Sequence, residues 1–217
     1  MSDDHIYTAS EFNLYSQVLD FLEEVYSRLG QYEQGSPSQE STMDVLTLSF
    51  VKAINDCRAI LLLTQAGFYI QAGILARSAQ DGCSLIMHIV FEGEDAALVK
   101  RWLGGHRLTH WTLVEKLNKH LPSEHQLDVA NYRKVRKRLD DLVHANYDAL
   151  KLYLSQSPGP TPLDGESLYA VTFWKRLVCL YLFSCLLAVE MIVPDLKDRA
   201  KSFLAQLELR SQNLNVA

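Results

Sequence analysis

Apolar residues recur at spacings of three and four along most of the chain, which is the pattern of helices that bury one face. In the first such segment this stripe joins Phe12, Tyr15, Leu19 and Leu22. No run of alternating apolar and polar residues is bounded by turn residues, so the sequence does not predict strands. The pattern predicts six main helices and a short seventh, over 10–33, 41–65, 68–91, 94–119, 123–150, 166–192 and 195–209.

The residues between these segments are typical of helix ends. Ser10 is the expected N-cap of the first helix, and Ser41 with Asp44 three residues later resembles a capping box at the second. Gly67 indicates a break between the second and third helices, and Pro194 ends the sixth. Loops and a frayed tail are expected at 34–40, 155–165 and 211–217.

Three of the predicted helices, 41–65, 68–91 and 166–192, carry apolar residues on nearly every face. We therefore expect them at the centre of the fold, with the other helices packed around them. Several joints are short, which favours antiparallel neighbours. The sequence predicts an all-α fold, an up-and-down helical bundle that forms a single domain over 1–217. The central helices have more apolar face than six helices easily cover, which predicts a homodimer.

Composition and charge narrow the class of protein. Of the 217 residues, 48% are apolar and 22% are charged, which is typical of globular proteins and excludes bulk disorder. The net charge of −5 excludes a surface that is basic throughout, so any contact with nucleic acid must come from a local patch. The four cysteines lie in separate apolar stretches, and we expect buried, reduced thiols at Cys57, Cys83, Cys179 and Cys185.

Two uncharged stretches raise the question of a membrane protein. They hold 18 residues between Arg58 and Arg77, and 13 between Arg176 and Glu190. Both are shorter than the roughly 20 residues that a spanning helix needs. The first ten residues are acidic and polar, unlike a signal peptide. We therefore expect a cytoplasmic protein without integral membrane association.

A basic run stands out in this acidic chain. In one interpretation it is a solvated helix face, in which aspartates pair with the cations. In the other it is a strip that binds phosphates beside a residue that transfers protons. Five of the six residues over 133–138 are cations: Arg133, Lys134, Arg136, Lys137 and Arg138.

His144 is the candidate for proton transfer near neutral pH. On a helix, Lys137, Asp141 and His144 share one face, whereas Leu139 lies on the opposing, core-facing stripe. Asp140 precedes His144 by four residues, so its carboxylate can hold the imidazole ring and favour the imidazolium. The second interpretation therefore places cations, carboxylates and a titratable ring along one helix.

The stretch from Arg138 to His144, Arg-Leu-Asp-Asp-Leu-Val-His, resembles the Arg-x(4–6)-His motif of HEPN-type helical proteins. Many proteins of that group are metal-independent RNases of toxin–antitoxin, abortive-infection and CRISPR systems. The resemblance implies a dimeric bundle in which Arg138 holds the scissile phosphate and His144 assists attack by the ribose 2′-OH. Tyr147 supports that site. RNA is then the substrate, no cofactor is needed, and a cognate antitoxin or regulator is a further partner.

A second resemblance covers roughly residues 45–190. The run around Arg77, Ser78 and Asp81 is similar to an Arg-Ser-x-x-acid helix of an uncharacterised bacterial all-helical family. In that family a later helix carries a Val-His stretch, which is similar to 142–147 here. Arg77 and Asp81 also stand four residues apart in an apolar helix. They can therefore form a buried ion pair that ties this helix into the bundle.

Two alternatives to an RNase stay open. One is a non-catalytic interaction or dimerisation module, favoured by Leu139, because catalytic HEPN motifs usually have a polar residue after the arginine. The other is a small-molecule or metal-binding sensor. For that sensor His106 and His110, four residues apart on one helical face, are the candidate metal ligands.

Overall fold

A computed structural model describes the chain over 7–29, 42–93, 114–115, 118–119, 129–143 and 171–214. Within these residues every regular element is helical, so the prediction of an all-α protein is confirmed. The elements are α1 (Ala9–Leu29), α2 (Thr42–Gln65), α3 (Tyr69–Glu92), α6 (Val129–Val143), α8 (Val171–Ile192), the 3₁₀ turn η2 (Pro194–Leu196) and α9 (Lys197–Leu214).

The observed bounds follow the predicted ones closely for α1, α2 and α3. The helix that was expected over 195–209 continues to Leu214 as α9, after the turn that begins at Pro194. The helix that was expected over 94–119 lies mostly outside the described residues, although 114–115 and 118–119 are helical. Over the described residues, no helix has the length and apolar character that crossing a membrane requires.

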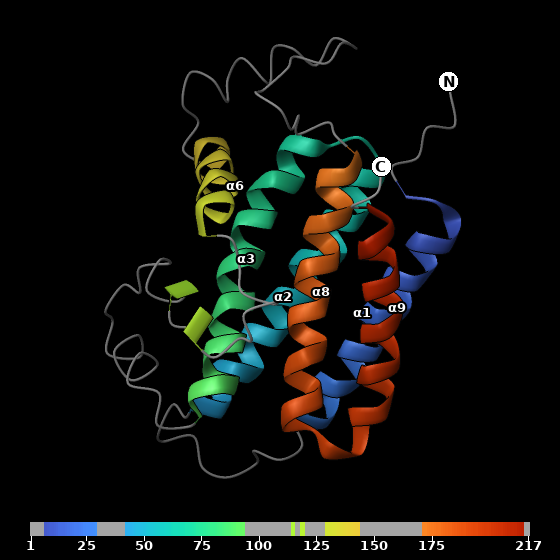
Figure 1. Ribbon diagram of the computed structural model, residues 1–217, viewed down its shortest axis with the longest axis vertical. Coiled ribbons are helices and arrows are strands. Elements are labelled where there is room, and N and C mark those ends of the chain that lie inside the picture. Colours follow the sequence, from blue (N-terminus) through green and yellow to red (C-terminus); the bar gives the residue numbers. More distant parts are fainter. Residues whose placement is uncertain are drawn as a thin grey trace.

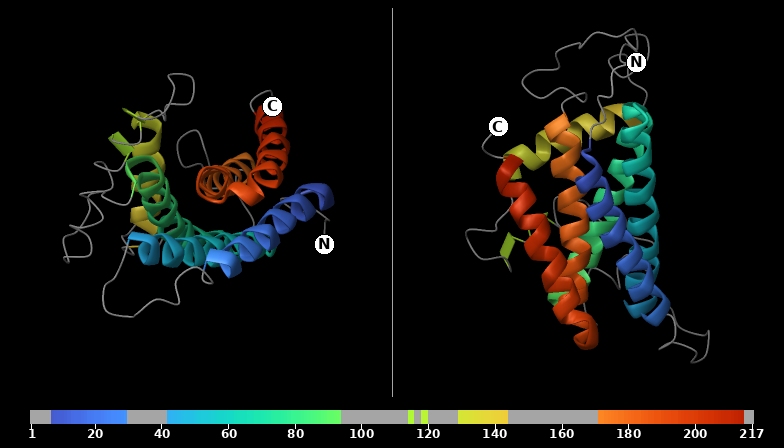
Figure 2. Two further views of the ribbon diagram at one scale, coloured as in Figure 1. Left: turned by 90° about the horizontal axis from the view of Figure 1, so that it is seen from below. Right: turned by 90° about the vertical axis from the view of Figure 1, so that its right-hand side faces the viewer.

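Helices α1, α2 and α3 form a curved row, with α8 on its concave side (Figures 1 and 2). In this arrangement α8 packs against α1, α2 and α3, and α9 folds back along α8. Helix α6 lies at the far end of the row, where it packs against α3. The row therefore has an apolar side built around α8 and an outer end that carries the basic run.

Helix α1 begins with a capping box at Thr8 rather than at Ser10. The Glu11 N–H donates to Thr8 Oγ1 at 3.2 Å, and the Thr8 N–H donates to Glu11 Oε2 at 2.8 Å. These two reciprocal bonds satisfy backbone donors that Ser10 would leave open, because only Thr8 has a glutamate three residues later. The prediction of Ser10 as the cap is therefore wrong. Ser10 Oγ instead accepts a hydrogen bond from Arg210 Nη2 at 2.8 Å.

The break predicted at Gly67 is confirmed. Gly67 has a φ of +83°, a conformation that only glycine adopts without strain. The Phe68 N–H donates to the Leu63 carbonyl at 2.8 Å, and the Gly67 N–H donates to the Thr64 carbonyl at 3.2 Å. This is the Schellman pattern of a helix C-terminus. The short joint turns the chain so that α3 packs back along α2.

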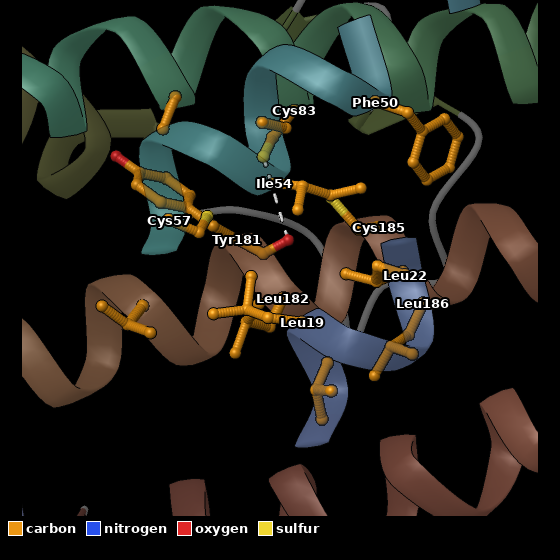
Figure 3. Close-up of a cluster of buried hydrophobic side chains, with 14 of the residues drawn as sticks. Leu19, Leu22, Phe50, Ile54, Cys57, Cys83, Tyr181, Leu182, Cys185 and Leu186 are labelled. Atoms are coloured by element: carbon orange, nitrogen blue, oxygen red, sulfur yellow. Dashed lines mark hydrogen bonds between the residues drawn. The ribbon is translucent and has the colours of Figure 1, made fainter. Parts of the chain in front are cut away.

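The core is apolar, and it includes side chains from each of α1, α2, α3, α6, α8 and α9. Figure 3 shows side chains of α1, α2 and α3 converging on Tyr181, Leu182, Cys185 and Leu186 of α8. The Tyr181 hydroxyl donates to the Ala76 carbonyl of α3 at 2.9 Å, so its one polar atom is satisfied inside this core. The predicted central position of α2, α3 and α8 is consistent with their many fully buried residues.

All four cysteines are buried and unbridged, as expected for small apolar side chains. Burial raises the pKa of the Cys179 thiol to about 11. Burial also raises the pKa of Cys57, whereas contact with Cys185 is the main cause of the raised pKa of Cys83. The thiols of Cys57, Cys83 and Cys179 are therefore neutral at physiological pH, and all four cysteines pack as small apolar groups.

Candidate charged site between α3 and α6

The basic run meets the rest of the molecule along one face of α3. Helical spacing places Arg77, Gln80 and Asp81 on the same side of α3, and it places Arg136 and Asp140 on the same side of α6. These two faces lie opposite each other, since α6 packs on α3. The expected Arg77–Asp81 ion pair is confirmed, but it is partly exposed rather than buried, and it is half of a larger network.

The four charged side chains form a closed ring of alternating charge. Arg136 Nη1 donates to Asp81 Oδ1 at 2.6 Å, and Arg136 Nε lies 3.3 Å from the Asp140 carboxylate. Arg77 donates to both of the same carboxylates, through Nε to Asp140 and through Nη1 to Asp81. Each aspartate therefore accepts from both arginines. Gln80 Oε1 accepts a further, longer bond from Arg136 Nη1 at 3.4 Å.

The arginines of this ring are buried more deeply than the aspartates. The Arg136 side chain is only 7% exposed, whereas the Asp81 side chain is 48% exposed. Burial alone would lower the pKa of Arg77, but the hydrogen bonds to Asp140 and Asp81 outweigh it and raise that pKa. The two carboxylates therefore balance the positive charges of both guanidiniums. The ring as a whole carries no net charge, so it fixes helix position more than it attracts an anion.

The other described cations of the basic run face solvent. Arg133, Lys134 and Lys137 are exposed, whereas Arg136 and Leu139 are buried against α3. One ion pair joins this exposed group to another segment, between Arg133 Nη2 and Glu115 Oε1 at 4.0 Å. The run is thus divided: one arginine anchors α6, and three cations line its outer face. The predicted core-facing position of Leu139 is confirmed.

Several predicted site residues lie where the structure gives no side-chain contacts. Arg138 and Asp141 belong to α6, but their side chains lie outside the described part. His144 and Tyr147 follow the last described residue of α6, and the candidate metal ligands His106 and His110 lie in the segment 94–113; all four are outside the described residues. Over the described residues, no group of three or more His, Cys, Asp or Glu side chains could hold a metal ion.

Sequence reasoning missed the inward position of Arg136 and the pairing of Asp140 with Arg77. In the phosphate-binding interpretation Arg136 binds substrate and Asp140 holds the His144 ring, whereas the other interpretation pairs the aspartates with the cations of the run. In the structure Arg136 and Asp140 contact each other and the Arg77–Asp81 pair. A usable signal was present, because Arg136 and Asp140 repeat the Arg-x-x-x-Asp spacing of Arg77 and Asp81.

The family model of DUF5677, described as a family of unknown function, matches residues 43–168, which is more than half of the chain. The chain belongs to the DUF5677 family. No curated protein and no solved structure matches it. The DUF5677 segment contains α2, α3 and α6, and so every residue of the charged ring. Helices α1, α8 and α9, which cover the apolar side, lie outside that segment.

Proposed function

We propose that this DUF5677 protein is a HEPN-like helical protein that binds RNA along the outer face of α6 and cleaves it without a metal. The observation that supports this proposal is the exposure of Arg133, Lys134 and Lys137 on a helix that is held firmly from behind. An exposed cation on an anchored helix can neutralise a phosphate with little loss of order on binding. In a chain of net charge −5, such a strip directs an anionic polymer to one place.

The catalytic part of the proposal comes from the HEPN resemblance. Arg138 holds the scissile phosphate, and His144 transfers a proton during attack by the ribose 2′-OH. The proposal includes a homodimer, in which the motifs of two copies share one cleft. It also includes a cytoplasmic location, a role in a bacterial defence or toxin–antitoxin type of system, and a six-helix up-and-down bundle completed by 94–119.

The experiment is a salt titration of binding to a single-stranded RNA. Each lost phosphate contact should reduce the slope of log affinity against log salt by roughly 0.7. Lys134→Ala and Lys137→Ala should each flatten that slope. Lys197→Ala removes an exposed lysine from the start of α9 and should leave the slope unchanged. If the wild-type protein does not bind RNA even at low salt, the proposal fails.

Cleavage is tested separately with His144→Ala. This variant should keep the wild-type affinity, because a neutral imidazole adds little Coulomb attraction, and it should lose cleavage. Retention of cleavage would remove His144 from the proposal while leaving the binding strip in place.

A second candidate function is a non-catalytic module that keeps the bundle and the binding face. The observation that favours it is the complete burial of Leu139 directly after Arg138. Catalytic HEPN motifs usually have a polar residue there, and a buried leucine supplies no group to a reacting phosphate. Salt-dependent RNA binding without cleavage in the wild-type protein would select this candidate.

A further inference from the structure

A groove of about 450 Å³ lies between the first part of α1 and the last part of α9. The N-terminal end of α1 and the C-terminal end of α9 lie at the same end of the molecule (Figure 1), and the Arg210–Ser10 hydrogen bond joins the two helices there. Both helices lie outside the DUF5677 segment, and the groove shares no residue with the charged ring. Its volume is within the range of sites that bind small molecules.

Arg210 gives the groove a cation that no carboxylate of the described residues contacts. Among the described residues its hydrogen-bond partner is the neutral hydroxyl of Ser10. Other arginines of the described part differ in this respect, since each of the following contacts at least one carboxylate: Arg28, Arg58, Arg77, Arg136 and Arg199. This end is therefore suited to an anion.

The remaining walls offer amide groups and apolar surface. Asn13 and Gln17 of α1 are exposed and line the groove, as does Gln206 of α9, whose Nε2 donates to the Ser202 carbonyl at 3.3 Å. Leu209 also lines the groove and leaves 63% of its surface in solvent. Amides can both donate to and accept from a peptide bond, and an uncovered leucine can contact an apolar side chain.

We propose that this groove binds the free C-terminal carboxylate of a short peptide with an apolar last residue. Arg210 pairs with the carboxylate, for which its planar fork of N–H donors is well suited. The amides of Asn13 and Gln17 bond to the last peptide unit, and Leu209 contacts the apolar side chain. The site is independent of the RNA strip on α6.

The test compares two probes that differ only in charge at one end, N-acetyl-leucine and N-acetyl-leucinamide. Each is titrated into the full-length, isotope-labelled protein, and amide chemical shifts are followed. The carboxylate should shift resonances of α1 and α9 in a saturable way. The amide analogue should bind at least about tenfold more weakly, because it lacks the charge-assisted hydrogen bond.

Substitutions locate the charge effect. Arg210→Gln should weaken binding of N-acetyl-leucine at least about tenfold and leave binding of the amide analogue unchanged. Lys201→Gln removes one exposed positive charge from the same helix and should change neither affinity. If Arg210→Gln does not fold, Leu209→Asp provides a second route, since a carboxylate beside the groove should also reject the probe.

Four results would overturn the inference, and three of them concern where and how the probes bind. These three are equal affinity for the two probes, an affinity for N-acetyl-leucine that Arg210→Gln leaves unaltered, and shifts confined to helices other than α1 and α9. Absence of saturable shifts would overturn it as well.

Discussion

Helix α8 is packed against four other helices, whereas α6 packs against α3 at the end of the helical row. The buried side chains of α8 are almost all apolar, and Trp174, Leu182 and Leu186 are fully buried. On α6 the described side chains that are buried are Leu139 and Arg136, and Arg136 is held by two carboxylates and an amide. The same all-helical chain thus attaches one helix by apolar area and another largely by charge.

The two kinds of attachment differ in how exactly they position a helix and in how much they contribute to stability. Burial of apolar area is strong but non-directional, so it sets which face of α8 points inward and little more. Hydrogen bonds between guanidinium and carboxylate groups are directional, so they set the register of α6 along α3. Their net contribution to stability is smaller, because Asp81 and Asp140 remain partly in water, where charges interact weakly.

Truncation of Trp174 is expected to have the largest effect. Trp174 is fully buried and stacks on Tyr69, with ring centroids 6.3 Å apart. Trp174→Ala should lower the free energy of unfolding by about 3–5 kcal/mol, through lost apolar burial and the cavity left behind. Urea unfolding measures this loss. Leu180→Ala, at a position on the same helix that is 38% exposed, is the control and should cost clearly less. Equal losses would contradict an apolar core centred on α8.

The second-largest loss of stability is expected from breaking the Lys175–Glu11 ion pair, which lies within the apolar side of the molecule. Lys175 of α8 donates to both oxygens of Glu11, at 2.9 and 2.7 Å, and the two side chains are only 12% and 11% exposed. Glu11→Gln leaves the Lys175 ammonium without its counter-charge, so we expect a loss of about 2 kcal/mol at neutral pH. This loss should exceed that of a charged pair in the α3–α6 ring, because less water screens it.

The pH dependence of that loss has a definite sign. Burial opposes ionisation of Glu11, but hydrogen bonds from Lys175 and Thr8 outweigh it and lower the pKa of the carboxyl. A lowered pKa in the folded protein means that the stabilisation is fully present above the ordinary value of 4.5 and is lost as the pH falls through the folded value. The difference between wild type and Glu11→Gln should therefore shrink in acid. A difference that grows as the pH falls would exclude this account.

The charged ring is tested by a double-mutant cycle on Arg136→Met and Asp81→Asn. Because the 2.6 Å contact joins a buried guanidinium to a half-exposed carboxylate, we expect a coupling free energy of about 1–2 kcal/mol. The coupling should decrease as salt is added, unlike the cost of Trp174→Ala. Single changes that add to within about 0.5 kcal/mol would show that Arg136 does not depend on Asp81.

The contrast between the two helices also explains what the sequence could and could not predict. The helical spacing of apolar residues and the residues that end helices were sufficient to predict the helices of the apolar side. For example, a helix was expected over 68–91, and α3 spans Tyr69–Glu92. The Arg77–Asp81 pair was predictable for the same reason, since both partners lie on one helix. Burial of an apolar stripe is a local property of the pattern, so it can be read before the neighbours are known.

The inward position of Arg136 could not be read in that way. The spacing of Arg136 and Asp140 is a hint, but Lys137 and Asp141 have the same spacing, and which cation meets another helix depends on α6 packing against α3. Asp140 was ambiguous for the same reason, since a sequence shows its neighbours on α6 but not the guanidinium of Arg77. The predicted N-cap of α1 was wrong by two residues. Thr8 and Ser10 are both suitable caps, and the hydrogen bonds of Glu11 select Thr8.

Substitution of Lys137 should have the smallest effect on stability. It tests whether the exposed cations of the basic run differ from the buried Arg136 in their structural role. Lys137 is adjacent to Arg136 in sequence, but its side chain is exposed on the outer face of α6. Lys137→Ala should change the free energy of unfolding by less than about 0.5 kcal/mol, since no buried contact is lost and alanine favours a helix. Urea unfolding of Lys137→Ala beside Arg136→Met compares neighbouring cations directly. Matching losses would mean that the run acts as one structural unit. A loss confined to Arg136→Met would show that Lys137 has no structural role, so that its effect on RNA binding could be measured without a change in fold.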